Sequence, residues 1–332
     1  MLFGLNEAAV ATPAVATKLF NESYDFVAME QEMIVESARA WNKIQYMVGE
    51  ANCRLIHESV TNPNGLENLM EGVVGGFFAK VKEFFIKLKN MIMEVFNKFM
   101  MWVNSKMKSE KDFAMKYEKE ILEKIVTIGE IDVKGFTYTN LDTAIPDIKT
   151  ADEISITGDD NDAKRKSIED IEAKYRGACV GEATKAIESE DFSENLFTYY
   201  RNGEDSPEEM TLKAADVKSI FNELKTFAKT KSDIEKDKGK IEKDLNKAIK
   251  VLETAEKNLK NGDDADKENR ITNIQLKIGA MKTMATNRNQ AFTAKIAAVK
   301  ERAEFGKRVV LAVKSAKKQN NSTVGGLFSM SI

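Results

Sequence analysis

The sequence contains little of the chemistry on which most catalytic and metal sites depend. Its 332 residues include one histidine, His57, and two cysteines, Cys53 and Cys179, that lie far apart. Neither cysteine belongs to a CxxC pair, so the common zinc and redox motifs are excluded. Walker, GxGxxG, HExxH and GxSxG patterns are also missing. We therefore predict a non-enzymatic protein without catalytic residues, cofactor or metal ion, and we expect two buried thiols in a reducing compartment.

Proline, glycine and long uncharged runs are scarce as well. The chain has 4 Pro and 18 Gly against 31% charged residues, a composition that favours long helices over a turn-rich sheet. No uncharged run approaches the ~20 apolar residues that a membrane-spanning helix needs. The first residues lack the basic segment of a secretory signal. We expect a protein that is made and kept in a cytoplasm-like setting.

The charge is nearly balanced overall but unevenly distributed. A net charge of −3 excludes nucleic-acid binding by bulk electrostatics. Acidic residues dominate 151–210, whereas basic residues dominate 277–318. Nucleic-acid contact through 277–318 is an alternative, but its basic residues recur around the helix. A solvated face is the favoured interpretation of this stretch.

The most informative stretch is 76–107, where large apolar residues recur every three or four positions, as on one face of a helix. Lysine, glutamate and asparagine occupy the opposite side. Because each large side chain gains roughly 1.5–3 kcal/mol on burial, this face has to be covered by a core, a partner or a membrane surface. The predicted protein or membrane contact face consists of Phe77, Val81, Phe84, Phe85, Leu88, Ile92, Val95, Phe99 and Trp102.

The remaining patterns predict a mainly α fold, built of amphipathic helices with a small β insertion and a long C-terminal antiparallel helical hairpin. Gly75 and Gly76 precede the apolar face and predict a flexible joint. We expect the following organisation: an N-terminal arm and helix at 1–64, an apolar and basic helical region at 65–128, a β segment of two or three short strands at 129–160, an acidic helical connector at 161–206, the hairpin at 207–320 and a flexible tail at 321–332.

Local signals place several element ends. Ser206 and Pro207 predict the start of the hairpin's first helix. The acidic loop at 158–162 lacks the spacing of a calcium-binding EF-hand and predicts a helix start instead. Within the hairpin, Lys238 interrupts a seven-residue apolar spacing, and Arg288 lies on the second apolar stripe. We expect Arg288 to reach the edge of the hairpin or to pair with an acid of the first helix.

Part of this layout resembles a known class of proteins. The Phe-rich helix is followed by Phe113, Tyr117 and Ile121 in the pattern FxxxYxxxI, and then by the stretch VKGFTYT at 133–139. Over roughly 76–140 the chain resembles virion structural proteins of large tailed bacteriophages. The resemblance implies a component of the capsid interior, neck, tail or baseplate, and it brings no catalytic residues with it.

Two functional hypotheses follow. The first is a virion structural protein, made in the host cytoplasm, whose partners are copies of itself and other virion proteins. The alternative is a helical membrane-active protein that stores the 76–107 segment against the hairpin and releases it onto a bilayer.

Overall fold

The computed structural model of the chain describes residues 66–204, 206–260 and 267–316. The expected N-terminal arm and helix, the tail, Cys53 and His57 lie outside these residues. Within them, seven α-helices and one two-stranded antiparallel sheet confirm the mainly α fold with a small β insertion.

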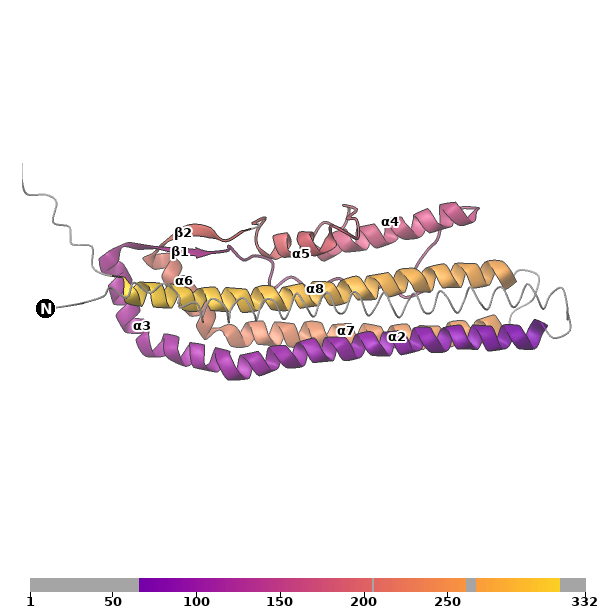
Figure 1. Ribbon diagram of the computed structural model, residues 1–332, viewed down its shortest axis with the longest axis horizontal. Coiled ribbons are helices and arrows are strands. Elements are labelled where there is room, and N and C mark those ends of the chain that lie inside the picture. Colours follow the sequence, from indigo (N-terminus) through magenta and orange to yellow (C-terminus); the bar gives the residue numbers. More distant parts are fainter. Residues whose placement is uncertain (1–65, 205, 261–266, 317–332) are drawn as a thin grey trace, which may run out of the picture.

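Three long helices run along the length of the molecule (Figure 1): α2 (Leu66–Trp102), α7 (Phe227–Lys260) and α8 (Lys267–Ser315). At 1.5 Å per residue the 49 residues of α8 span about 73 Å. Cross-contacts define the directions of α2 and α7. Lys82 lies 2.5 Å from Glu253, and Lys89 donates to Asn246 at 3.2 Å. A step of seven residues forward along α2 thus matches a step of seven residues back along α7, so the two helices are antiparallel.

The C-terminal helices form the antiparallel pair that the sequence predicts. Asp237 and Asp244 of α7 contact Lys295 and Arg288 of α8, respectively, so a step of seven residues along α7 matches a step of seven residues back along α8. Lys238, the residue that interrupts the apolar spacing, lies half-buried on this pair. Its ammonium lies 5.4 Å from the Phe96 ring centroid and 2.8 Å from Glu242, which satisfies the charge.

Two shorter helices, α4 (Asn161–Cys179) and α5 (Phe192–Tyr200), pack along α8. The helix start predicted from the acidic loop at 158–162 is confirmed, since α4 begins at Asn161. The start of α4 is fixed by a cap, because the Asp160 side chain accepts a hydrogen bond from the Ala163 N–H at 2.7 Å. The helix ends where the turn at 182–187 folds back onto Gly177, at which a Cβ would lie 1.9 Å from the Lys185 carbonyl oxygen.

At one end of the bundle α2 continues through a π-helical segment (Val103–Met107) into α3 (Lys108–Ile128), and α6 (Ala214–Lys225) packs against α3. The predicted joint at Gly75 and Gly76 is not a break, because the backbone of α2 is helical through both residues. A glycine costs a helix only about 1 kcal/mol, less than the neighbouring packed face contributes.

The sheet differs most from the sequence-based prediction. Only β1 (Glu130–Gly135) forms within 129–160, and its partner is β2 (Glu208–Lys213), where a helix start was expected. The helix prediction at 208–213 was wrong because long-range pairing overrides the local Ser-Pro signal. Asp132 lies opposite Thr211, and the Thr211 hydroxyl donates to its carboxylate at 2.7 Å.

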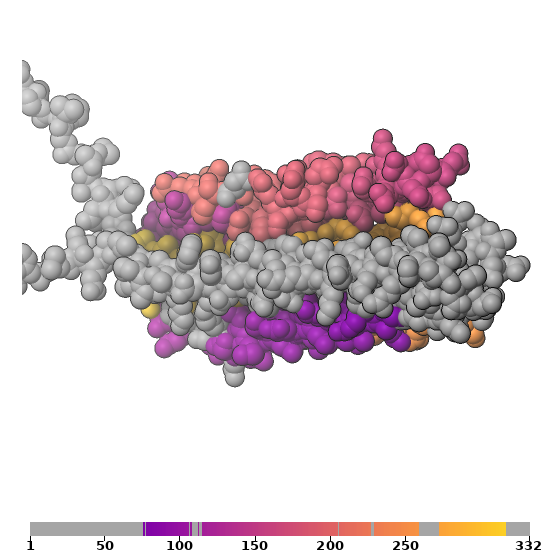
Figure 2. Space-filling model, turned by 45° about the vertical axis from the view of Figure 1, so that its right-hand side comes forward, coloured from indigo at the N-terminus to yellow at the C-terminus, as the bar shows by residue number. Residues whose placement is uncertain are grey.

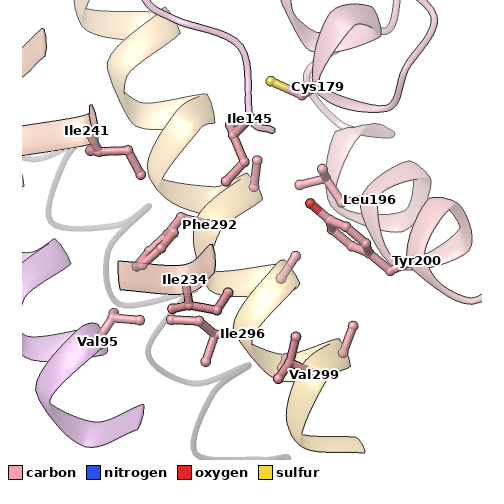
Figure 3. Close-up of a cluster of buried hydrophobic side chains, with 14 of the residues drawn as sticks. Val95, Ile145, Cys179, Leu196, Tyr200, Ile234, Ile241, Phe292, Ile296 and Val299 are labelled. Carbon is pink, nitrogen blue, oxygen red and sulfur yellow. The ribbon is translucent and has the colours of Figure 1, made fainter. Parts of the chain in front are cut away.

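The hydrophobic core follows the length of α8. Figure 3 shows buried side chains from neighbouring helices and from the loop before α4 converging on it. Phe292, Ile296 and Val299 of α8 meet side chains from the surrounding elements, namely Val95 of α2, Ile145 of the loop, Leu196 and Tyr200 of α5, and Ile234 and Ile241 of α7. The apolar residues that were expected to form further strands, such as Ile145 and Ile148, are buried here without strand pairing.

Candidate functional site

The predicted contact face lies inside the bundle. Eight of its nine side chains are at most 7% exposed, and the side chain of Phe77 lies outside the described set. The buried members are Val81, Phe84, Phe85, Leu88, Ile92, Val95, Phe99 and Trp102.

Contacts within the chain account for much of this burial. Helix α2 packs on α7 and α8. Phe99 stacks on Trp102 at 5.9 Å, and the Lys300 ammonium of α8 lies 5.6 Å from the Trp102 ring. The Leu88 carbonyl accepts a hydrogen bond from the Asn289 amide at 3.3 Å. Contact of this face with a partner or a membrane stays a prediction. Within the described ranges, no helix is both long enough and apolar enough to cross a bilayer.

The central helix α8 carries polar side chains into the interior. Every residue from 287 to 300 is buried, so this segment has no solvent-facing stripe. An amphipathic pattern therefore cannot describe it. Its buried polar and charged residues are Asn287, Arg288, Asn289, Gln290, Thr293, Lys295 and Lys300.

Two of these cations form what we call the ionic seam, defined by Asp147, Asp237, Asp244, Arg288 and Lys295. The Lys295 ammonium donates to Asp237 at 2.6 Å and to the Thr143 carbonyl at 2.9 Å, and its side chain is 1% exposed. The Arg288 guanidinium, 2% exposed, donates to Asp244 and, at 2.8 Å, to Asp147. The seam thus ties α7 and the loop before α4 to α8.

The seam was only partly predictable. The expected pairing of Arg288 with an acid of the first hairpin helix is confirmed by Asp244. Sequence reasoning missed Asp237 and Lys295. The signal that could have found them is the equal spacing of seven residues between the two acids and between the two cations. Asp147 comes from an irregular loop, which offers no periodic pattern.

Other charged residues of the basic stretch 277–318 also form ion pairs within the molecule. Arg302 donates to both Glu223 oxygens and, at 2.8 Å, to the Tyr138 carbonyl. Glu301 accepts a bidentate pair from Arg201, with the shortest distance 2.7 Å. Arg308 remains exposed. Nucleic-acid contact through this stretch stays a prediction.

A hollow of about 340 Å³ lies where the loop after β1, the end of α6, the start of α7 and α8 meet. Leu141, Leu224 and Val299 contribute apolar wall, and the Arg302–Glu223 pair contributes a charged wall that is already neutralised internally. Around it and elsewhere in the described part of the chain, no three His, Cys, Asp or Glu side chains converge as a metal-binding group.

Three tyrosine hydroxyls and one cysteine thiol are buried around α8. Burial raises the pKa of the Tyr138, Tyr175 and Tyr200 hydroxyls well above the ordinary value, and it raises the pKa of the Cys179 thiol to about 12. Tyr175 also donates to the Pro146 carbonyl at 2.9 Å. The folded state therefore keeps these groups neutral where the unfolded chain would ionise them.

We predict cooperative unfolding at alkaline pH. Above about pH 10 the unfolded chain loses protons that the folded chain retains, so stability falls as pH rises, by roughly 1.4 kcal/mol per group per pH unit. The share of tyrosinate absorbance at 295 nm that comes from these three hydroxyls should appear together with the loss of helix signal, at about pH 11. In Tyr200→Phe, which removes one titrating group, the midpoint should move to higher pH. Ionisation of all seven tyrosines near pH 10 with the helix signal intact would contradict this expectation.

With this geometry established, the fold defines the class of the molecule as an elongated single-chain helical bundle closed by a small sheet at one end. Comparisons with protein-family models, with curated proteins and with solved structures found no match for the chain.

Proposed function

We propose that this protein is a non-enzymatic structural component of a bacteriophage particle, in the capsid interior, neck, tail or baseplate. It acts through helix packing and through assembly with copies of itself and with other virion proteins. The chain would be made in the host cytoplasm and carried in the virion. The resemblance of 76–140 to virion structural proteins of large tailed phages supports the assignment to a phage particle. The helical architecture supports a structural role within it.

The observation that carries the structural role is the embedding of α8. A helix about 73 Å long is buried over 287–300, tied to α7 and to the loop before α4 by the ionic seam, and packed against α2, α4, α5 and α7. Side chains that would be reactive in an open cleft are here committed to internal pairs. Such an arrangement is suited to a rigid rod that holds a distance between neighbours in an assembly.

Quantitative mass spectrometry of purified particles tests the proposal. We expect the chain in particles at a stoichiometric copy number, retained after washing with high salt and nuclease. A chain that occurs only in the infected-cell lysate would overturn it. Leakage from anionic liposomes by the purified protein, without its presence in particles, would favour the membrane alternative.

A further inference from the structure

The two-stranded sheet leaves one strand on the outside of the molecule. β1 packs on α8, whereas β2 contacts β1 and α6 and lies at the periphery in Figure 1. In the space-filling view of Figure 2 the salmon-coloured segment that includes β2 is at the surface. Glu208, Glu209, Thr211 and Lys213 of β2 have exposed side chains. An exposed outer strand is a template for pairing with another chain.

The hydrogen bonds show which backbone groups of β2 point outward. The Lys213 N–H donates to the Asp216 carboxylate at 2.8 Å, so it faces away from β1. Backbone direction alternates along an antiparallel strand, which turns the N–H and C=O groups of Thr211 and Glu209 outward as well. The side-chain bond between Thr211 and Asp132 fits the close, non-hydrogen-bonded pairs of such a ladder. Among the described residues, no backbone bond outside the ladder involves Glu209 or Thr211.

The side chains of this edge are complementary to themselves. If a second β2 lies antiparallel about a two-fold axis at Thr211, Glu209 faces Lys213 of the second copy, and Lys213 faces its Glu209. Shifting the register by two residues in either direction removes these Glu–Lys pairs. The half-buried Met210 would lie opposite Leu212 of the second copy on the inner face, which extends the apolar side of the sheet.

Within one chain, β1 and β2 also place glutamate opposite lysine. Glu130 lies opposite Lys213, and Lys134 lies opposite Glu209. Across two copies, a row of four strands would therefore read Glu130, Lys213, Glu209 and Lys134, with the sign of the charge alternating at every step.

We propose that the outer edge of β2 pairs with the same edge of a second copy of this chain, and that the two chains share a four-stranded antiparallel sheet with two-fold symmetry. The backbone bonds between the copies centre on Thr211, and the Lys213 position contributes its side-chain charge, because its N–H stays bonded to Asp216. Such an isologous contact closes on itself and gives a dimer instead of a filament. Because an edge contact of six residues is small, we expect a Kd in the micromolar range or above, which the crowded interior of a particle would offset. The inference adds a contact to the proposed assembly role, but its test on pure protein does not depend on a phage.

Sedimentation equilibrium of the purified full chain, over concentrations from roughly 1 µM to 1 mM, tests the pairing around the Kd expected for a small interface. Glu209→Lys and Lys213→Glu each place like charges opposite one another at both ends of the edge, and each should weaken dimerisation roughly tenfold. An equimolar mixture of the two variants restores unlike pairs and should associate as the wild type does. This rescue cannot result from misfolding, and thermal melts of each variant check that its fold is kept.

Two further variants test the backbone contacts. Thr211→Pro removes an N–H that faces away from β1, so it should abolish the dimer. Thr211→Val loses the same hydroxyl bond to Asp132 but keeps the N–H, so it should still dimerise. Lys166→Glu, a charge reversal of the same kind on the exposed surface of α4, is the matched control and should leave association nearly unchanged. A wild-type chain that stays monomeric up to about 1 mM overturns the proposal. So does a dimer that persists in both Glu209→Lys and Thr211→Pro, because another surface would then hold it.

Discussion

Replacing Phe84 and Leu88 together by aspartate is expected to unfold the bundle. Their side chains are 3% and 1% exposed, and Phe84 makes an edge-to-face contact with Phe85 at 5.7 Å. Each substitution loses roughly 1.5–3 kcal/mol of apolar burial and adds the several kcal/mol that an unpaired buried carboxylate costs. The sum approaches the ~5–15 kcal/mol by which a typical domain is stable. Far-ultraviolet circular dichroism, solubility and thermal melting measure the effect.

The same helix supplies the matched control for this double variant. Ile86 and Met101 are 47% and 69% exposed, so Ile86→Asp combined with Met101→Asp introduces the same charge into the same helix at the surface. That control should keep its helix content and melt within a few degrees of the wild type. If instead Phe84→Asp with Leu88→Asp kept its melting temperature and lost only liposome binding, the face would serve a membrane and the packed interpretation would be wrong.

The burial of this face was predictable because its information is local. Residues such as Phe84, Leu88 and Val95 repeat at helical spacing within one continuous stretch, and a periodic apolar stripe needs no knowledge of the partner. The sequence did not reveal what covers the stripe. The covering helix α7 lies well over a hundred residues further along the chain, and the pairs that align it, such as Lys82 with Glu253, have no local signature.

β2 shows how local information misleads. Ser206 and Pro207 are good residues for a helix start, and Glu208 and Glu209 suit a first turn. The strand exists because β1, more than seventy residues earlier, offers a complementary row of charges and a buried face. Sheet pairing is set by cross-strand neighbours, and those become visible only when the register is known.

The burial of α8 could not be predicted from sequence periodicity, for a different reason. A helix surrounded by others has no polar face, so its buried asparagines, arginine and lysines break the stripe that a search expects. Small residues such as Ala291, Ala294 and Ala298 permit this close embedding. The polar residues are tolerated because most find partners, although the Asn287 amide nitrogen and the Asn289 amide oxygen have none among the described residues. The seam is therefore a property of the assembled bundle.

Removing one charge from the seam is expected to destabilise the protein strongly. Asp237→Asn removes the anionic partner of the 1%-exposed Lys295 ammonium and leaves it, among the described residues, with neutral oxygen acceptors such as the Thr143 carbonyl. Breaking a buried pair from one side typically costs about 3–5 kcal/mol, which lowers Tm by on the order of 10 °C in a protein of this size. Chemical denaturation with urea, followed by circular dichroism, gives the change in free energy directly.

Two variants identify the cause of that loss. Asp233→Asn lies one turn earlier on α7, where the side chain is 25% exposed and pairs with Lys236, and it should cost no more than about 1 kcal/mol. Asp237→Leu combined with Lys295→Met removes both charges from the interior, and because desolvating a buried pair offsets much of its attraction, this double variant should be near wild type or more stable. A double variant as unstable as Asp237→Asn, together with an equally large loss in Asp233→Asn, would mean that α7 tolerates no change there and that the seam has no special role. The expected ordering, with Asp237→Asn far less stable than the other two variants, would show that the loss comes from the uncompensated charge of Lys295 and not from the altered shape of α7 at this position.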